Sequence, residues 1–204
     1  MKSIVQIENL SKYFAGKRVL NNVSFDVYDD EILVIMGPSG VGKSTLLNLI
    51  GQLDSKYEGR IAYDPVVFEG HQVPFPFVFQ ASESLLPWLN VEDNIKLVKK
   101  DLSEEALNDV LAQVELLEHR TKMPHALSGG MKQRVGIARA LVCHSKLLLM
   151  DEPFSSLDAD LRKKLQDLII QIKKERRLTI IFVTHDIEEA NRIGTRIITL
   201  ESAK

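Results

Sequence analysis

The sequence predicts an α/β fold built around a mainly parallel β-sheet. Apolar runs at 31–36, 147–151 and 179–184 are short and rich in Leu, Ile and Val, as expected of strands buried on both faces. Helical patterns follow these runs, and such an alternation of strands and helices is typical of a parallel sheet. Further core strands are expected near Pro76 and Arg196.

The N-terminal part of the chain is expected to lie beside that sheet. The segments 4–10 and 23–27 look like the edge strands of a separate antiparallel piece. They precede the first core strand, so the antiparallel piece should flank the site that this strand leads to.

A glycine-rich loop follows the first core strand and matches the phosphate-binding pattern G-x-x-x-x-G-K-[ST] without a gap. A helix over 44–50 comes next and ends at Gly51. The loop N–H groups and the helix N-terminus attract phosphate. Lys43 can reach the β- and γ-phosphates, and the Ser44 hydroxyl can ligate Mg²⁺. The sequence therefore predicts a P-loop NTPase whose nucleotide is held by Gly37, Pro38, Ser39, Gly40, Gly42, Lys43, Ser44 and Thr45.

Two adjacent acids, Asp151 and Glu152, end the second core strand, at the sheet edge where α/β folds bind ligands. Neighbouring strand residues point in opposite directions, so the two carboxylates are expected to divide the work. Asp151 would organise Mg²⁺ and Glu152 would polarise the attacking water. The alternative is an acidic turn after a core strand, but the phosphate loop in the same chain favours ATP hydrolysis.

The segment Leu127-Ser-Gly-Gly-Met-Lys-Gln-Arg134, called the signature segment below, places a good N-cap and two glycines before an expected helix over 131–142. This is a second helix N-terminus suited to an anion. Together with the phosphate loop and the acidic strand, it makes the chain resemble the ATP-binding cassette (ABC) proteins over almost its whole length. Met131 stands where the family often has Gln, but several importer branches also have Met there, so activity is expected.

The resemblance implies roles for residues at matching positions. Tyr13 stands where an aromatic ring stacks on adenine, and Gln80 where the Q-loop glutamine helps to organise Mg²⁺. Asp158 ends the D-loop segment, and His185 matches the switch histidine, which can donate a hydrogen bond to the γ-phosphate. In such proteins two cassettes, here expected to be identical, enclose two ATP molecules. The signature segment of one cassette, here Ser128, Gly129 and Gly130, caps the γ-phosphate of the ATP that the other cassette holds.

Three of these assignments have plainer alternatives. Tyr13 could be an ordinary surface tyrosine, and Phe14 beside it could share the stacking. His185 could be a histidine whose hydrogen bonds are satisfied at a strand end, although the Asp186 helix cap after it places it at the same sheet edge as Glu152. Gln80 is assigned mainly from its order in the chain and from the strand before it.

Between 81 and 144 the pattern becomes helical, so we expect a single domain over 1–204 with a helical subdomain inserted in the ATP-binding core. One helix is expected over 91–99 and another from Ser103 to about Glu118. After the Q-loop come Leu85 and Trp88, at the place where resembling transporters receive a short cytoplasmic helix of the membrane subunit. The alternative is that these two residues belong to the local core.

Composition is ordinary for a globular protein, with 26% charged and 45% hydrophobic residues. The one cysteine, Cys143, allows no disulfide framework and indicates a reducing compartment. No signal peptide is apparent and no apolar run approaches the ~18 residues of a membrane span. The protein is therefore expected in the cytoplasm, on the inner face of the cell membrane, and its net charge of -2 predicts no nucleic-acid partner.

These features predict an ATPase subunit that powers bacterial import of a small solute through separate permease subunits, with a solute-binding protein as a possible further partner. The segments around the Q-loop and the signature segment resemble the importer branch for nitrate, sulfonates and taurine. Two departures are that 63–76 is shorter and richer in proline than expected, and that the sequence stops at Lys204, so that a regulatory C-terminal domain is not expected. The alternatives are an efflux or lipid-extraction ATPase, which needs the same catalytic parts, and a soluble cassette acting on ribosomes or DNA.

Overall fold

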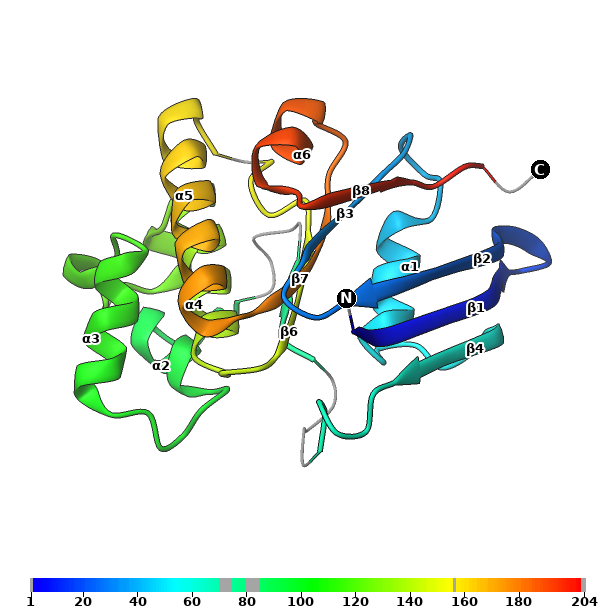
Figure 1. Ribbon diagram of the computed structural model, residues 1–204. Helices are drawn as coiled ribbons and strands as arrows, with labels where there is room; N and C mark the ends of the chain where they lie inside the picture. Colours follow the sequence, from blue (N-terminus) through cyan, green and yellow to red (C-terminus); the bar gives the residue numbers. More distant parts are fainter. Residues whose placement is uncertain (1, 70–74, 80–84, 156, 203–204) are drawn as a thin grey trace.

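The computed structural model describes residues 2–69, 75–79, 85–155 and 157–202. Its central sheet is parallel throughout, with the strand order β5-β6-β7-β3-β8 (Figure 1). The predicted parallel core is therefore confirmed at every expected position. The strands are β3 (Ile32–Met36), β5 (Phe77–Val78), β6 (Leu147–Asp151), β7 (Thr179–Val183) and β8 (Arg196–Thr199).

A separate antiparallel sheet has the order β2-β1-β4, with β1 over Ser3–Phe14, β2 over Lys17–Tyr28 and β4 over Glu58–Tyr63. The first two strands run well beyond the predicted 4–10 and 23–27. Register shifts interrupt their pairing, and Asn9 and Asn22 adopt left-handed backbone conformations, with φ angles of 50° and 49°. These irregularities break the alternation of apolar and polar residues, which is why the sequence pattern shows only part of each strand.

Six α-helices are described: α1 (Lys43–Ile50), α2 (Val91–Lys96), α3 (Glu104–Gln113), α4 (Gly129–Leu141), α5 (Ala159–Arg176) and α6 (Ile187–Ile193). The predicted helix caps at Ser128 and Asp186 are confirmed, since each side chain accepts a backbone N–H of the first turn. Ser103 and Asp158 cap α3 and α5 in the same way. The second helix of the helical segment ends at Gln113, earlier than the predicted Glu118. Glu115 has a φ of 54°, which stops the helix before a short 3₁₀ turn at Leu117–His119.

The central sheet is covered on both faces. Side chains such as Leu33, Leu149 and Ile181 pack with α1 and the antiparallel sheet, whereas Val34 and Met150 pack with α4, α5 and α6. Successive strand residues face opposite layers, so each apolar run supplies both cores. In Figure 1 the antiparallel sheet and the group α2, α3 and α4 lie at opposite ends of the molecule, with the parallel sheet between them.

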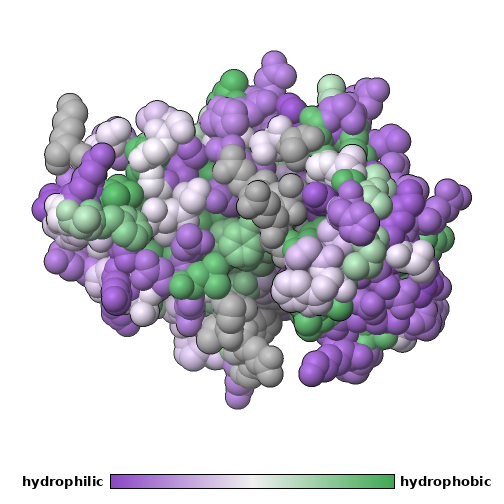
Figure 2. Space-filling view, turned by 180° about the vertical axis from the view of Figure 1, so that it is seen from behind, coloured by the Kyte–Doolittle hydropathy of each residue, from purple (hydrophilic) through white to green (hydrophobic). Residues whose placement is uncertain are grey.

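The helical group falls within the predicted range 81–144, the first residues of which lie outside the described part. No helix in the described part of the chain is long and apolar enough to cross a membrane. The face seen in Figure 2 is mostly hydrophilic, with apolar residues in separate areas. Cys143 is half-buried just beyond the end of α4.

Candidate nucleotide-binding site

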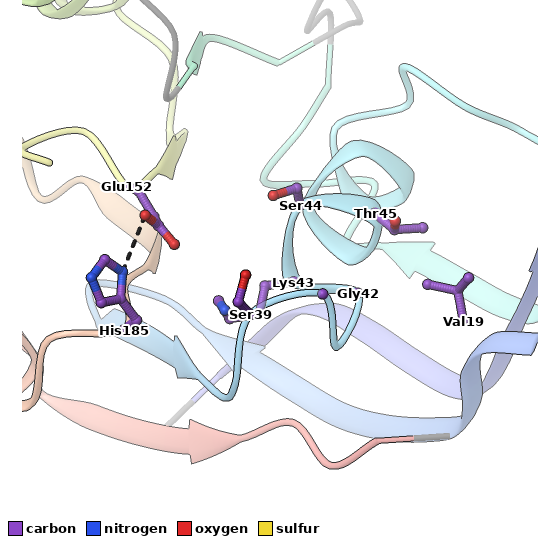
Figure 3. Close-up of a pocket in the computed structure, with 9 residues that line it drawn as sticks. Val19, Ser39, Gly42, Lys43, Ser44, Thr45, Glu152 and His185 are labelled. Carbon is purple, nitrogen blue, oxygen red and sulfur yellow. Dashed lines mark ion pairs between the residues drawn. The ribbon is translucent and has the colours of Figure 1, made fainter. Parts of the chain in front are cut away.

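A cavity of about 420 Å³ lies where three neighbouring strands of the parallel sheet end (Figure 3). The phosphate loop follows β3, Glu152 follows β6 and His185 comes shortly after β7, so the strand order β6-β7-β3 brings the three segments together. Ligands bind at this edge in open α/β sheets. The cavity is lined by Val19, Ser39, Gly40, Gly42, Lys43, Ser44, Thr45, Glu152 and His185.

The phosphate loop has the tight backbone that its glycines were expected to allow. Gly42 caps α1 with a left-handed φ of 103°, and a Cβ there would lie 2.8 Å from Leu20 Cδ2. A side chain at this position would be strained and would also clash, so glycine is needed to bring the loop into the helix. The N-terminus of α1 consequently opens toward the cavity, where it favours an anion.

Lys43 lies folded against its own loop. Its ammonium group donates hydrogen bonds to the carbonyls of Gly37 at 2.8 Å and Pro38 at 3.1 Å, and the residue is only 6% exposed. Gly37 and Pro38 do not line the cavity themselves, but they position the lysine that does. A cation is thus held at the cavity wall in a fixed geometry.

Asp151 is buried beside the loop. Burial raises its pKa, helped by the charge of Glu152, whereas a hydrogen bond with Ser44 and the charge of Lys43 act in the opposite direction. Its Oδ1 atom is buried and has no hydrogen-bond partner among the described residues. A buried carboxylate oxygen that is free to accept, next to a hydroxyl, is a suitable pair of ligands for Mg²⁺.

The residues described here contain no cluster of three or more His, Cys, Asp or Glu side chains that could hold a metal ion by itself. Mg²⁺ is commonly bound by one or two protein ligands together with phosphate and water oxygens. The predicted set of Ser44 and Asp151 fits such a site. The third predicted ligand, Gln80, lies outside the described residues.

Glu152 and His185 meet at the mouth of the cavity. His185 Nδ1 lies 3.1 Å from Glu152 Oε2, and the histidine side chain is 65% exposed whereas that of the glutamate is 15% exposed. Glu152 has a left-handed φ of 43°, and its N–H donates to the carbonyl of Val183 on the neighbouring strand. Non-glycine residues held in this backbone region are often found at functional sites.

Tyr13 is not among the residues that line the cavity. It is 39% exposed, its phenolic oxygen accepts a hydrogen bond from Arg18 Nε at 2.9 Å, and the Arg18 guanidinium lies over its ring. Phe14 points to the other side of the strand, where its ring lies 4.8 Å from the ammonium of Lys12. Lys12 is buried, and its ammonium group donates a hydrogen bond to Asp54, in the segment after α1. Phe14 is therefore on the side of the strand that faces α1.

The signature segment and Asp158 also lie apart from this cavity. Ser128 caps α4 and accepts the N–H of Met131 at 3.2 Å, and Asp158 caps α5. A Cβ built on Gly129 would meet nothing within 4 Å, so the start of α4 is accessible. None of Ser128, Gly129, Gly130 and Asp158 is among the residues that line the cavity of their own chain.

Two features of the site are absent from the sequence-based prediction. Val19 lines the cavity from β2, and the buried Gln133 side chain donates to the carbonyl of Phe79 at 3.0 Å, joining α4 to the segment after β5. The signal for Val19 would have been the recognition that 17–28 is one long strand. Gln133 lies within the signature segment, where its polar character gave no reason to expect burial.

Comparisons with known proteins agree with this geometry. The family model described as ABC transporter matches residues 20–155. The nitrate transport protein NasD of Klebsiella oxytoca is 40% identical, covering 98% of this chain and 81% of that protein. The aliphatic sulfonates import ATP-binding protein SsuB of Bacillus licheniformis is 42% identical, covering 89% of this chain and 72% of that protein.

A solved structure gives the same result for the fold. The dimeric, post-hydrolysis structure of the ATP-binding cassette MJ0796 bound to ADP and Pi superimposes with a TM-score of 0.85 at 33% identity, covering 97% of this chain and 94% of that one. The agreement extends over both sheets and the helical group, since nearly the whole chain is covered. The chain therefore belongs to the ABC transporter family, in which it is an ATP-hydrolysing cassette.

Proposed function

We propose that the cavity binds ATP with Mg²⁺ and hydrolyses it between two copies of this chain, and that hydrolysis powers import of a small solute through separate permease subunits. The observation that carries the proposal is that the phosphate loop, Glu152 and His185 line one cavity. An anion-binding helix terminus, a base for water and a hydrogen-bonding group for the terminal phosphate are the parts that phosphoryl transfer to water requires.

Each side chain has a role that follows from its place. Lys43 and the loop N–H groups hold the phosphates, and Ser44 and Asp151 supply oxygens to Mg²⁺, together with Gln80 by its order in the chain. When bound, the metal would neutralise charge on the phosphate oxygens. Glu152 orients the attacking water and accepts its proton, and His185 hydrogen-bonds the γ-phosphate. The contact between these last two residues fixes both at the mouth of the cavity.

A second copy would complete the site. The signature segment offers a helix N-terminus and an accessible Gly129, but it lies apart from the phosphate loop of its own chain. The solved relative MJ0796 is dimeric by its description. In our proposal Ser128, Gly129 and Gly130 of one copy contact the γ-phosphate held by the other, so that binding of ATP and closure of the dimer are one event.

The relatives NasD and SsuB are named for nitrate transport and for aliphatic sulfonate import. By this similarity we assign the cassette to an importer that works on the inner face of the cell membrane. The apolar residue offered to a permease is Trp88, whose exposure is 68%, whereas Leu85 is buried and belongs to the core. The buried Asn94 holds this loop in place, because its side chain bonds the backbone of Leu86, Leu89 and Asn90.

We expect Trp88→Ala to separate the cassette from its membrane partner without loss of ATP binding, because an exposed aromatic residue on a rigid loop is a typical anchor of an interface. The tagged protein would be purified from detergent-solubilised native membranes in ATP, and membrane proteins with several spans would be identified by mass spectrometry. Leu53→Ala, at another exposed apolar residue, is the control. Recovery of only ribosomal or other soluble partners with the unmodified protein would contradict the transport proposal.

Removal of Mg²⁺ by EDTA should stop ATP hydrolysis, and Asp151→Asn should weaken the dependence of ATP affinity on Mg²⁺. The same variant should be more stable than the unmodified protein without nucleotide. Burial raises the pKa of Asp151, so its ionised form disfavours folding, and this destabilisation grows as the pH rises through the pKa of the folded state. The gain in melting temperature should therefore be larger at pH 7 than at pH 3, which lies below the ordinary aspartate pKa of 3.8, and an equal gain at both values would contradict this account.

The adenine contact can be assigned by comparing Tyr13→Ala with Phe14→Ala. Base stacking on an aromatic ring contributes about 1–3 kcal/mol, so loss of the stacking residue should raise the Kd for ATP by roughly tenfold or more. Because Phe14 is on the face of β1 that looks toward α1, we expect a contribution from Phe14 as well as from the predicted Tyr13. Titration with ATP and with inorganic triphosphate separates adenine from phosphate contacts, and unchanged ATP affinity in both variants would exclude this strand.

A further inference from the structure

A polar network lies behind the contact between Glu152 and His185, at the start of α6. The Thr184 hydroxyl donates to Glu189 Oε2 at 2.7 Å and accepts the N–H of Asp186 at 3.0 Å. Thr184 is 2% and Glu189 7% exposed, so this network is part of the interior. The Thr184 hydroxyl thus ties Thr184 to Asp186 and to Glu189. Because Thr184 and Asp186 flank His185, the position of the histidine backbone depends on this hydroxyl.

Arg162, in the first turns of α5, joins this network to a second segment. Its Nη2 donates to the carbonyl of Leu157 at 3.2 Å, in the loop that leads from β6 and Glu152 into α5. On the other side, Nη1 lies 3.6 Å from Asp186 Oδ2 and Nε lies 3.8 Å from Glu189 Oε1. One guanidinium therefore spans the segment that carries His185 and the loop that follows Glu152.

The distances from the guanidinium to the two carboxylates, 3.6 Å and 3.8 Å, are slightly longer than those of hydrogen bonds. Arg162 Nε is buried and has no hydrogen-bond partner within the part of the chain that the structure describes. A shift of less than about 1 Å would bring both carboxylates within hydrogen-bond distance of the guanidinium. Charge-assisted bonds of this kind are strong and directional, so they can select one relative position of the two segments.

The same loop also supports the signature segment. A Cβ built on Gly130 would lie 3.0 Å from Leu157 Cδ2, which shows how closely the Leu157 side chain packs on the start of α4. Leu157 is itself buried. The loop whose carbonyl Arg162 binds therefore contacts the part of this chain that is proposed to meet the nucleotide of the second copy.

We infer that Arg162 is a positioning residue for ATP hydrolysis, which acts through His185. The guanidinium of Arg162 holds the 184–186 segment close to the Leu157 carbonyl. In this way it sets the position of His185, which lies in the first segment, relative to Glu152, which precedes the loop that contains Leu157. Arg162 does not line the cavity, so ATP binding should not depend on it. The inference rests on the proposed function, because it assigns both residues to the hydrolytic step.

The test is a double-mutant cycle with single-turnover measurement of ATP hydrolysis. Arg162→Gln should lower kcat by about tenfold and leave the KM for ATP unchanged, since misplacement of a catalytic group affects the reaction more than binding. In the His185→Ala background the same substitution should have little further effect, because residues that act through one another are not additive. Arg192→Gln is the matched control, since Arg192 pairs with Asp167 and also joins α6 to α5.

An equal loss in both backgrounds, a rise in KM, or the same loss in Arg192→Gln would overturn the inference. If Arg162→Gln does not fold, Glu189→Gln removes the charge facing Arg162 but keeps an oxygen for the Thr184 hydroxyl. It should lower kcat only when His185 is present, and unchanged kcat would again overturn the inference. The proposed function has its own readout, because hydrolysis that persists in Glu152→Gln would overturn that function, whatever Arg162→Gln does.

Discussion

Glu152→Gln is expected to bind ATP with normal affinity but to hydrolyse it at least ~10²-fold more slowly, a rise of about 2.7 kcal/mol in the barrier. The glutamine keeps the size of the side chain and can still contact His185, whose Nδ1 lies 3.1 Å from the glutamate oxygen. It cannot accept a proton from water. The phosphate loop follows a different strand, β3, and is untouched by the substitution, so the loss should fall on kcat.

The same variant should accumulate as an ATP-bound dimer, because in the proposed function closure needs ATP and opening needs its hydrolysis. Size-exclusion chromatography with light scattering would show a dimer with ATP and a monomer with ADP. Glu188→Gln, at an exposed acid near the start of α6, is the matched control and should hydrolyse ATP normally. Turnover at the unmodified rate in Glu152→Gln would remove Glu152 from its role, and the assignment of the base would then have to move to another group at this sheet edge.

The sequence predicted the parts of the site that depend on local pattern. A glycine loop between an apolar run and a helix is expected at the carboxyl end of a parallel strand. Two acids that end another apolar run are expected at the same edge of the sheet. The order of the strands in that sheet then decides that Glu152 and His185 meet across β6 and β7. The pattern gives the ends of the strands, and chain topology brings them together.

What the sequence did not predict depends on contacts between distant segments. Val19 reaches the cavity only because β2 is long and irregular, and its bulges conceal the strand pattern. Arg162 reads as an ordinary charged residue of a surface helix, yet its guanidinium contacts Leu157, Asp186 and Glu189. Such a network has no sequence spacing of its own, because its members come from separate elements whose packing is set by the cores on the two faces of the sheet.

Lys43→Ala should act on ATP binding, in contrast to Glu152→Gln. The ammonium group is held by the carbonyls of Gly37 and Pro38 and faces the cavity from a buried position. Its hydrogen bonds to phosphate would be charge-assisted and worth about 1.5–3 kcal/mol, so the Kd for ATP should rise roughly tenfold to a hundredfold. The fold should persist, because Gly37 is only half-buried and Pro38 is exposed, so that the two carbonyls that lose their donor can bond water.

The measurement is a titration with ATP by calorimetry, in parallel with the exposed Lys100→Ala as control. Circular dichroism and thermal melting without nucleotide would show that the variant is folded. Because Lys43 also contributes a charge that favours ionised Asp151, Mg²⁺ should increase ATP affinity less in Lys43→Ala than in the control. Unchanged ATP affinity in a folded Lys43→Ala would contradict the assignment of the phosphate loop, and with it the position of the nucleotide on which the roles of Glu152 and His185 depend.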